Sequence, residues 1–304
     1  MAEIRRSGTW GSALTADEFA AIRSVGFEPV GQVLGAAVYS IGFTGGYNCP
    51  GAWGSMGYGG VVPARTVTQV SSRGGFGSFA PLVQSMYEAR HKAIDRMTTE
   101  CVELGGHGVV GVKLTIGSFP AGGLEFKAIG TAIRAPGVPP IPVGARGAKK
   151  AKHWGPFTSD LSGQDFVKLI MKGWVPAGLV LGISIGSRHD DWLTVGQTRW
   201  GAGNAEVVGY TELVNDARHD ARVQLERDVK RLGGEGVVIA TMEMNVRERE
   251  CPVQEGRRDH IVEATTIGTA IARFARTEQH PSGPKTLAIM SLDPQRRQAA
   301  RIRI

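Results

Sequence analysis

The sequence has few of the features that mark a secreted scaffold or a membrane protein. Its three cysteines stand at positions 49, 101 and 251, an odd number at irregular spacing. Such cysteines do not make a disulfide framework and fit a reducing compartment. No stretch approaches the roughly 18 consecutive apolar residues needed to span a bilayer. We therefore expect a soluble cytoplasmic protein.

Catalytic and metal-binding motifs are also missing. No CxxC, HxxxH or HExxH spacing occurs, and the glycine-rich segment at 51–60 lacks the Lys-Ser/Thr ending of a phosphate-binding loop. Catalysis needs a nucleophile beside a base, or paired carboxylates in a pocket. Because no such set occurs in both halves of the chain, we expect a protein that is not an enzyme.

The positive charge lies outside the segments expected to fold. The chain carries a formal net charge of +7, yet residues 134–153 and 274–304 together contribute more than that, so the remainder is slightly acidic. A domain that grips nucleic acid usually carries its positive charge on a folded face. The charge therefore suggests a basic linker and tail that could anchor the protein to an anionic partner.

One pattern occurs twice, 128 residues apart. Each copy has apolar residues at helical spacing and then a glycine pair, Gly105-Gly106 or Gly233-Gly234, before a short apolar segment. This predicts an amphipathic helix, a C-cap and a strand in both halves. The residues of the two buried helical faces are Met86, Ala89, Ala93, Met97, Cys101 and Leu104, and Val214, Ala217, Ala221, Leu225, Val229 and Leu232.

A second correspondence, at an offset of 147, lies ahead of each long helix. Thr15 with Glu18, and Ser162 with Asp165, have the spacing of helix N-caps. Each short helix is followed by an apolar strand that we expect to end at glycine, at 35 and at 182. An apolar run of this kind predicts burial on both faces.

After each long helix the residues alternate between apolar and polar, first in residues 110–116 and then in residues 238–244. This period of two predicts a half-buried strand, and a return strand follows in both halves. In the second half we expect a long charged hairpin loop from Arg247 to Asp259, containing Cys251. The predicted fold class is α+β, with two tandem β-α-β-β units that each place a helix on a small sheet.

These patterns divide the chain into four parts. We predict a first repeat at 1–134, a Pro/Gly-rich basic linker at 135–152, a second repeat at 153–273 and a basic tail at 274–304. The first repeat carries a glycine-rich insertion at 43–60. Its aromatic residues could belong to an ordered surface loop or to an arm that contacts a neighbouring subunit. These residues are Tyr47, Trp53 and Tyr58.

The motifs, in this order, resemble the YbjQ-like family, described as putative heavy-metal-binding proteins. The first copy carries ARHKA at 89–93, LGGHGVVGV at 104–112 and GTA at 130–132; the second carries ARHDA at 217–221, LGGEGVV at 232–238 and GTA at 268–270. Single members are about one repeat long and form five-membered rings, so the resemblance implies oligomerisation, and a ring is expected here. The tandem arrangement and the insertions depart from the family, which leaves the number of subunits open. The family has no settled set of metal ligands to carry over.

Metal binding by soft ligands would need thiolates or imidazoles that converge. Cys101 aligns with Val229, so we expect it in the core. Cys49 and Cys251 each precede a proline in an insertion, and we expect them to be the accessible thiols, either as lone loop residues or as ligands of a soft metal ion. The other candidates are His91 and His219, which we expect on the helix surface.

Two arginines at the margins of the helical faces are candidates for assembly contacts. Arg90 and Arg218 are equivalent, and each either pairs with a carboxylate at a packing interface or lies on a solvated flank. Glu125 and Glu263, equivalent strand residues, are the expected partners. The first functional hypothesis is a non-enzymatic scaffold that assembles with itself into a ring or shell. The alternatives are a binding protein for a soft metal or small ligand, and an anchor to an anionic partner.

Overall fold

The computed structural model describes residues 11–40, 69–70, 79–119, 123–141, 155–198, 203–251 and 256–274. The described residues from 11 to 273 belong to one compact unit. The elements in chain order are α2 (Ala16–Ser24), β1 (Glu28–Ser40), β2 (Gln69–Val70), α4 (Ala80–Glu103), β3 (Gly108–Phe119), β4 (Gly123–Arg134), β5 (Phe157–Thr158), α5 (Gly163–Met171), β6 (Trp174–His189), α6 (Trp192–Thr198), α7 (Val208–Arg231), β7 (Gly236–Glu250) and β8 (Arg258–Arg273).

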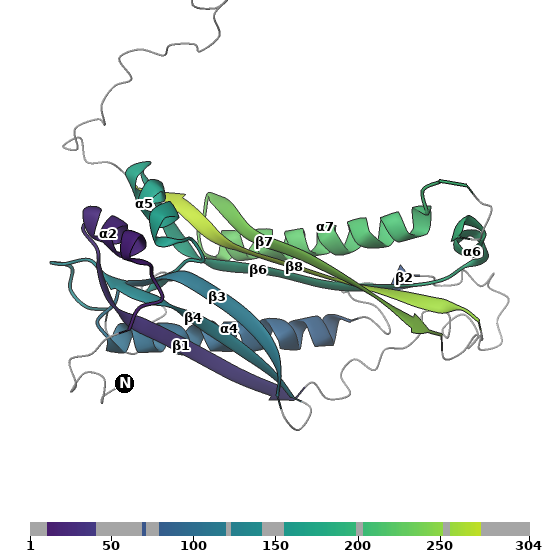
Figure 1. The fold of residues 1–304 in the computed structure, drawn as a ribbon, viewed down its shortest axis with the longest axis horizontal. Helices are drawn as coiled ribbons and strands as arrows, with labels where there is room; N and C mark the ends of the chain where they lie inside the picture. Colours follow the sequence, from purple (N-terminus) through teal and green to yellow (C-terminus); the bar gives the residue numbers. More distant parts are fainter. Residues whose placement is uncertain are drawn as a thin grey trace, which may run out of the picture. The chain divides into compact units, whose positions relative to one another are not determined.

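The fold is α+β, as expected, and a short helix, a strand, a long helix and two strands follow one another in this order twice (Figure 1). The halves differ in the element before the long helix, which is β2 in the first and α6 in the second. We call residues 11–134 the N-terminal half and residues 157–273 the C-terminal half. One sheet has the order β1-β4-β3-β5 and the other β2-β6-β8-β7, and within each half the neighbouring strands are antiparallel. This arrangement is consistent with two YbjQ-like domains. The predicted boundaries between the four parts stay a prediction.

The predicted helix ends are confirmed. The Thr15 hydroxyl accepts a hydrogen bond from the Glu18 amide while the Glu18 side chain accepts one from the Thr15 amide, and Ser162 caps α5 through the Asp165 amide. The long helices end at Leu104 and Leu232, and the next residues, Gly105 and Gly233, both have φ of 72°. Glycine adopts this left-handed conformation at no steric cost.

The first strand of each half does not end at its glycine, as the sequence suggested. β1 continues to Ser40 and β6 to His189, so Gly35 and Gly182 lie inside the strands. Each glycine faces the long helix of its half, and an added Cβ would lie 2.0 Å from the carbonyl oxygen of Ala93 or Ala221. These glycines therefore let helix and sheet approach closely.

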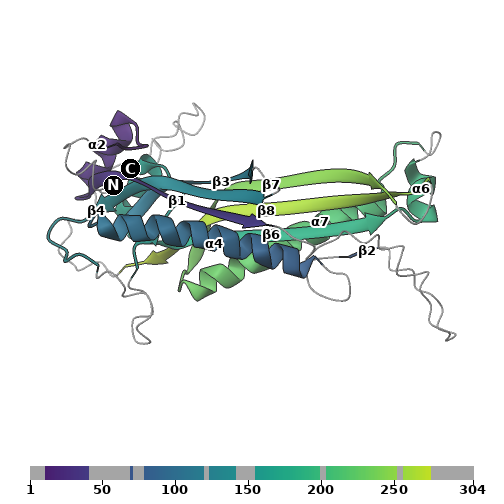
Figure 2. The ribbon, with the colours of Figure 1, turned by 90° about the horizontal axis from the view of Figure 1, so that it is seen from below.

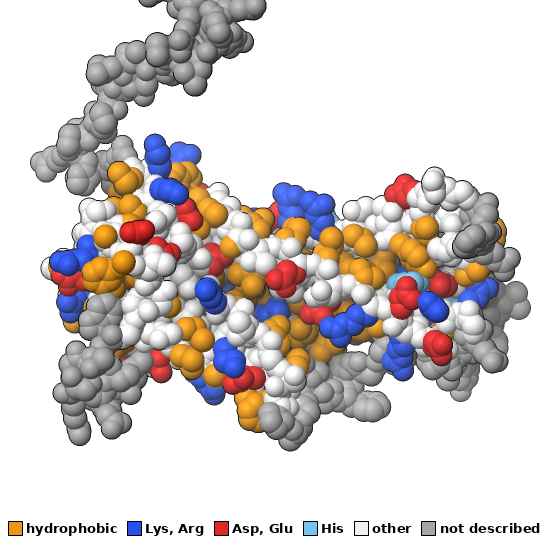
Figure 3. Space-filling view, viewed as in Figure 1, with side chains coloured by type: hydrophobic (Ala, Val, Ile, Leu, Met, Phe, Trp, Pro, Cys, Tyr) orange, Lys and Arg blue, Asp and Glu red, His pale blue; other side chains and the backbone are white. Residues whose placement is uncertain are grey.

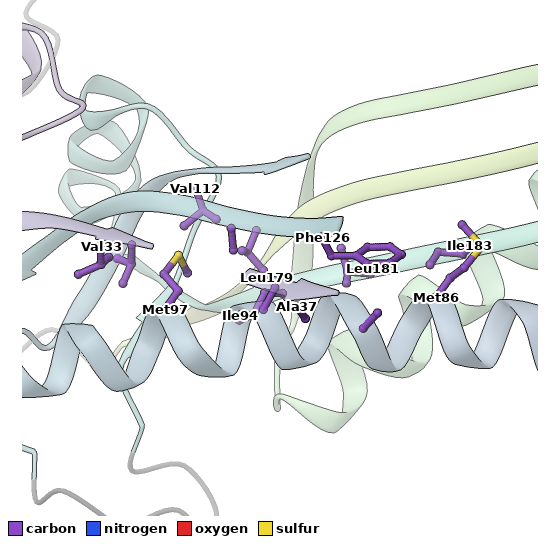
Figure 4. Packing of buried hydrophobic residues seen from close by; sticks show 14 of the residues in the cluster. Val33, Ala37, Met86, Ile94, Met97, Val112, Phe126, Leu179, Leu181 and Ile183 are labelled. Carbon is purple, nitrogen blue, oxygen red and sulfur yellow. The ribbon is translucent and has the colours of Figure 1, made fainter. Parts of the chain in front are cut away.

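Helix α4 packs against both sheets. One face lies on β1 and β4 through Ala89, Ala93 and Met97, while the same core takes in Leu181 and Ile183 of β6. Figure 1 shows α4 on one side of β6 and α7 on the other, and in the turned view of Figure 2 α4 runs alongside β1 and β6. Figure 4 shows the side chains of this shared core along α4.

Burial on both faces is confirmed for β6 and wrong for β1. Every residue of β6 from Gly178 to His189 is buried, and as far as Ile185 one face of the strand packs into the core around α4 while α7 lies on the other face. In β1 the face opposite α4 is open, and Leu34 and Val38 are 43% and 46% exposed. The two halves thus differ in what covers equivalent strands.

The charged hairpin of the C-terminal half is mostly strand. β7 runs to Glu250 and β8 begins at Arg258, so only residues 251–257 connect them, rather than Arg247 to Asp259. Arg247 pairs with Ile261 and Arg249 with Asp259 across the ladder. Residues 247–250 are all charged, with positive and negative side chains in turn, and all are exposed because β7 is an edge strand. In the sequence such a charged segment resembles a loop.

Candidate assembly interface

The two halves meet at a cavity of about 1090 Å³ between α4, β3 and β4 on one side and β6, β7 and β8 on the other. Its lining combines apolar residues, such as Phe126 and Ile267, with charged residues from both halves. The charged lining residues are Arg90, Lys113, Lys127, Asp160, Glu243, Arg247 and Glu263. The contact between the halves is therefore partly a hydrophobic core and partly a cavity with charged side chains in its lining.

Arg90 is the most buried cation in this contact. Its side chain is 4% exposed, and its Nη1 atom has no hydrogen-bond partner among the described residues. Burial lowers the pKa of Arg90 to about 10, although the nearby carboxylates of Glu263 and Glu243 favour the charged form. Arg90 thus faces the carboxylates of the other half.

The equivalent arginine of the C-terminal half is in the opposite situation. Arg218 is exposed on α7, and so is His219 beside it. Glu125 instead forms an ion pair with Lys127, at 2.8 Å between the charged atoms. Of the two alternatives that the sequence left open for this arginine position, Arg218 shows the solvated flank, whereas the pairing of Arg90 with a carboxylate stays a prediction.

This difference yields a matched pair of substitutions. Arg90→Ala should lower the free energy of unfolding by about 1–3 kcal/mol, because it removes buried packing and one of the two cations near Glu263, which keeps its 3.7 Å ion pair with Arg247. Arg218→Ala should change it by less than about 0.5 kcal/mol, since that side chain is exposed. Urea unfolding under conditions that keep the protein monomeric measures both. Equal effects would contradict the placement of Arg90 between the halves.

A second contact between the halves extends the sheet of the N-terminal half. β5 pairs in parallel with the start of β3, and the Ser159 amide donates to the Val109 carbonyl at 2.8 Å. Gly111 and Val112 of β3 in turn donate to the Leu161 and Ser159 carbonyls. This segment, residues 157–161, therefore covers the outer edge of β3.

The same segment is tied to its own half by side chains. The Asp160 amide donates to the Thr269 hydroxyl of β8 at 3.1 Å. Before α2, the Ala13 amide donates to the equivalent Thr131 hydroxyl of β4, also at 3.1 Å. Residues 11–14 are thus hydrogen-bonded to the N-terminal half in the same way as residues 158–161 are to the C-terminal half.

The outer edge of β7 corresponds to the outer edge of β3, but no described segment pairs with it in the same way. Among the described residues, no backbone hydrogen bond reaches this edge between residues 236 and 246. The strand also exposes apolar side chains, with Met244 at 42% and Val246 at 58%. In Figure 3, hydrophobic and charged side chains are interspersed over this face of the molecule. An uncovered edge strand with apolar residues is a ready site for strand pairing.

His91 lies deeper than expected. Its ring packs edge to face on Tyr87 with centroids 4.3 Å apart, and its Nε2 atom is 3.8 Å from a carboxylate oxygen of Asp228 on α7. Burial lowers the pKa of His91 despite the opposing effect of Asp228. His91 therefore belongs to the contact between the halves, whereas His219 is exposed.

The remaining predicted residues divide into two groups. Cys49, Tyr47, Trp53 and Tyr58 lie outside the described residues, as do most of the basic linker and nearly all of the tail. Cys101 is buried in the core, and burial raises the pKa of its thiol to about 12. Cys251 is 7% exposed, so it is not the accessible thiol that the sequence suggested. It lies beside His189 and Asp259, which the sequence analysis did not single out.

Comparison with known proteins identifies the family. Residues 61–136 match the model of the YbjQ-like family, described as putative heavy-metal-binding. A UPF0145 protein of Halorubrum lacusprofundi is 37% identical over 70 residues, which are 23% of this chain and 67% of that protein. The chain belongs to the YbjQ-like family. Another UPF0145 protein, from Thermosipho africanus, is 38% identical over 58 residues, 19% of this chain and 54% of the relative.

A longer relative matches almost the whole YbjQ-like chain. The encapsulin nanocompartment protein of Mycobacterium tuberculosis is 29% identical over 279 residues, which are 88% of this chain and 87% of that protein. Neither this name nor that of the UPF0145 relatives is the name of an enzyme.

The metal in the family's description has no evident ligands in the matched range. Among the described residues of 61–136, no three side chains of His, Cys, Asp or Glu converge. No helix in the described part of the chain is long and apolar enough to cross a membrane.

Proposed function

We propose that this protein is a non-enzymatic scaffold that assembles with itself into a ring or shell, in which copies repeat head to tail the contact between its own two halves. The uncovered outer edge of β7 carries the proposal. Its counterpart β3 is covered by the segment ahead of α5, and residues 11–14 ahead of α2 are held like that segment. Residues 11–14 of one copy would therefore pair with β7 of the next.

The outer face of β1 supports the same arrangement. At the offset of 147, Leu34 and Val38 correspond to Leu181 and Ile185, which are buried under α4. In the proposed assembly, α7 of a neighbouring copy covers Leu34 and Val38. Arg218 on that helix would then meet Glu125, as Arg90 meets Glu263 within one chain. A contact between two different surfaces of this kind builds rings when its rotation closes.

The name of the mycobacterial relative places that protein in a nanocompartment, which agrees with a role in assembly. The family resemblance adds the expectation of a ring, with the number of subunits left to measurement. Cytoplasmic location and anchoring through the basic linker and tail remain predictions. Salt-dependent binding to an anionic partner that is lost on deleting residues 291–304 would support the anchoring role.

Light scattering after size-exclusion chromatography tests the assembly. The unmodified chain should be a multimer at micromolar concentration. Val38→Lys should raise the concentration at which half of the protein is assembled by about tenfold or more, because Val38 lies opposite Glu125 in the sheet and the new cation would oppose Arg218 of the neighbour. The matched control is Met171→Lys on α5, where Met171 is 65% exposed and its counterpart Ser24 is exposed as well.

A charge exchange makes the test specific. Arg218→Glu and Glu125→Arg should each weaken assembly, and the two together should recover part of the loss. An unmodified chain that is monomeric at micromolar concentration would refute the proposal. So would a Val38→Lys chain that assembles as well as the Met171→Lys control.

A further inference from the structure

Three side chains that could bind a metal ion lie close together at one end of the sheet β2-β6-β8-β7, away from the contact between the halves. A nitrogen of His189, the sulfur of Cys251 and a carboxylate oxygen of Asp259 all lie within 4.8 Å of one another. All three residues are buried, at 5%, 7% and 0% exposure. They are the only such group in the part of the chain that the structure describes.

The sheet register explains why residues so distant in sequence meet. His189 ends β6 and pairs directly with Asp259 of β8, and their side chains form a hydrogen bond of 2.7 Å. Cys251 follows β7 at once, and its amide donates to the carbonyl of Arg257, the residue before β8. The backbone therefore holds each of the three side chains at a fixed place.

The donor set suits a borderline-soft divalent cation. Zinc binds Cys sulfur at about 2.3 Å, His nitrogen at about 2.0–2.1 Å and carboxylate oxygen at about 2.0–2.2 Å. For an ion to bind here, the Cys251 sulfur would approach the other two atoms, and the His189–Asp259 pair, now 2.7 Å apart, would open to admit the ion. Mg²⁺ and Ca²⁺ prefer oxygen ligands and would gain little from the thiol and the imidazole. Three protein ligands leave a fourth tetrahedral position open.

We propose that His189, Cys251 and Asp259 bind one zinc-class ion. Binding releases the thiol proton to solvent as the sulfur becomes a thiolate ligand. The ion displaces the proton between Nδ1 of His189 and the Asp259 carboxylate, and that proton is replaced by one on Nε2, so that the imidazole stays neutral. The ion links the end of β6, the start of β8 and the connection between β7 and β8. It lies outside the range matched by the family model and does not depend on the proposed assembly.

The test uses the full chain, treated with a chelator and then dialysed against Zn²⁺ or Co²⁺. We expect about one metal ion per chain and a thiolate-to-cobalt charge-transfer band in the near-ultraviolet spectrum. Zinc should also slow the reaction of Cys251 with a thiol reagent in the native protein, and the chelator should reverse this. Cys101 should react only on unfolding, because it is fully buried.

Variants decide whether these residues are the ligands. Cys251→Ser should abolish the charge-transfer band, and His189→Gln and Asp259→Asn should each weaken zinc binding at least about tenfold. Cys49→Ser and His219→Gln, which change the other candidates named from the sequence, should bind as the unmodified chain does. Chain that takes up no zinc, or zinc uptake that Cys251→Ser leaves unchanged, would overturn the assignment. Protection of Cys251 from the reagent is measured on the unmodified chain, so it tests the site even if a variant fails to fold.

Discussion

Gly35→Ala should lower the free energy of unfolding by about 3 kcal/mol or more. The new methyl carbon would lie 2.0 Å from the Ala93 carbonyl oxygen and 2.5 Å from the Met97 amide nitrogen, both of which belong to the backbone of α4. No side chain can rotate away to make room, so the helix would have to move off the sheet. Gly182→Ala should have a similar effect, because its methyl carbon would lie 2.0 Å from the Ala221 carbonyl oxygen.

Gly117→Ala is the matched control. Gly117 also lies in a strand, β3, but an added Cβ there would have no atom within 4 Å. This substitution should change the free energy of unfolding by less than about 0.5 kcal/mol. Denaturant unfolding followed by circular dichroism measures all three variants. If Gly35→Ala is as stable as Gly117→Ala, then α4 does not pack on β1 as closely as described.

Leu181→Ala should destabilise both halves together, by about 2–5 kcal/mol. Leu181 belongs to β6 in the C-terminal half, is fully buried, and packs into the core around α4 of the N-terminal half. Hydrogen exchange should therefore show faster exchange in β1 and β4 as well as in β6 and β8. Leu193→Ala on α6, where the side chain is 49% exposed, should leave exchange in both sheets nearly unchanged.

The same experiment tests the division into two repeats. Faster exchange confined to β6 and β8 after Leu181→Ala would mean that the halves open independently, as separate domains do. It would also contradict the shared core along α4. A common response would mean that the two repeats, whatever their origin, open as one cooperative unit.

Local signals in the sequence predicted much of the fold. The spacing of Ala89, Ala93 and Met97 gave the buried face of α4, and Thr15 and Ser162 gave the starts of the short helices. These features depend on residues that are close in sequence, so they can be recognised from the sequence of a single strand or helix. The position of Arg90 at the margin of its helix allowed either a packing contact or a solvated flank, and the sequence did not choose between them.

Features that depend on distant residues were not predicted correctly. Gly35 and Gly182 looked like strand ends, because their reason for being glycine is the backbone of a helix far along the chain. His189 gave no signal of its own, since its partner Asp259 is 70 residues away and only the β6–β8 register brings them together. The nearest signal was Cys251, which the sequence placed in a loop with an unknown neighbour.

The packing of α4 on β6 has one further consequence, for how the protein responds to dilution. Both surfaces belong to one chain, so they meet at a local concentration that the connection between them sets and that the amount of protein in solution does not alter. In an assembly of separate single-repeat proteins, every contact of this kind would have to form by collision between two molecules. In the proposed assembly every second contact would already be formed within each newly folded chain, and lowering the concentration would open only the contacts between chains.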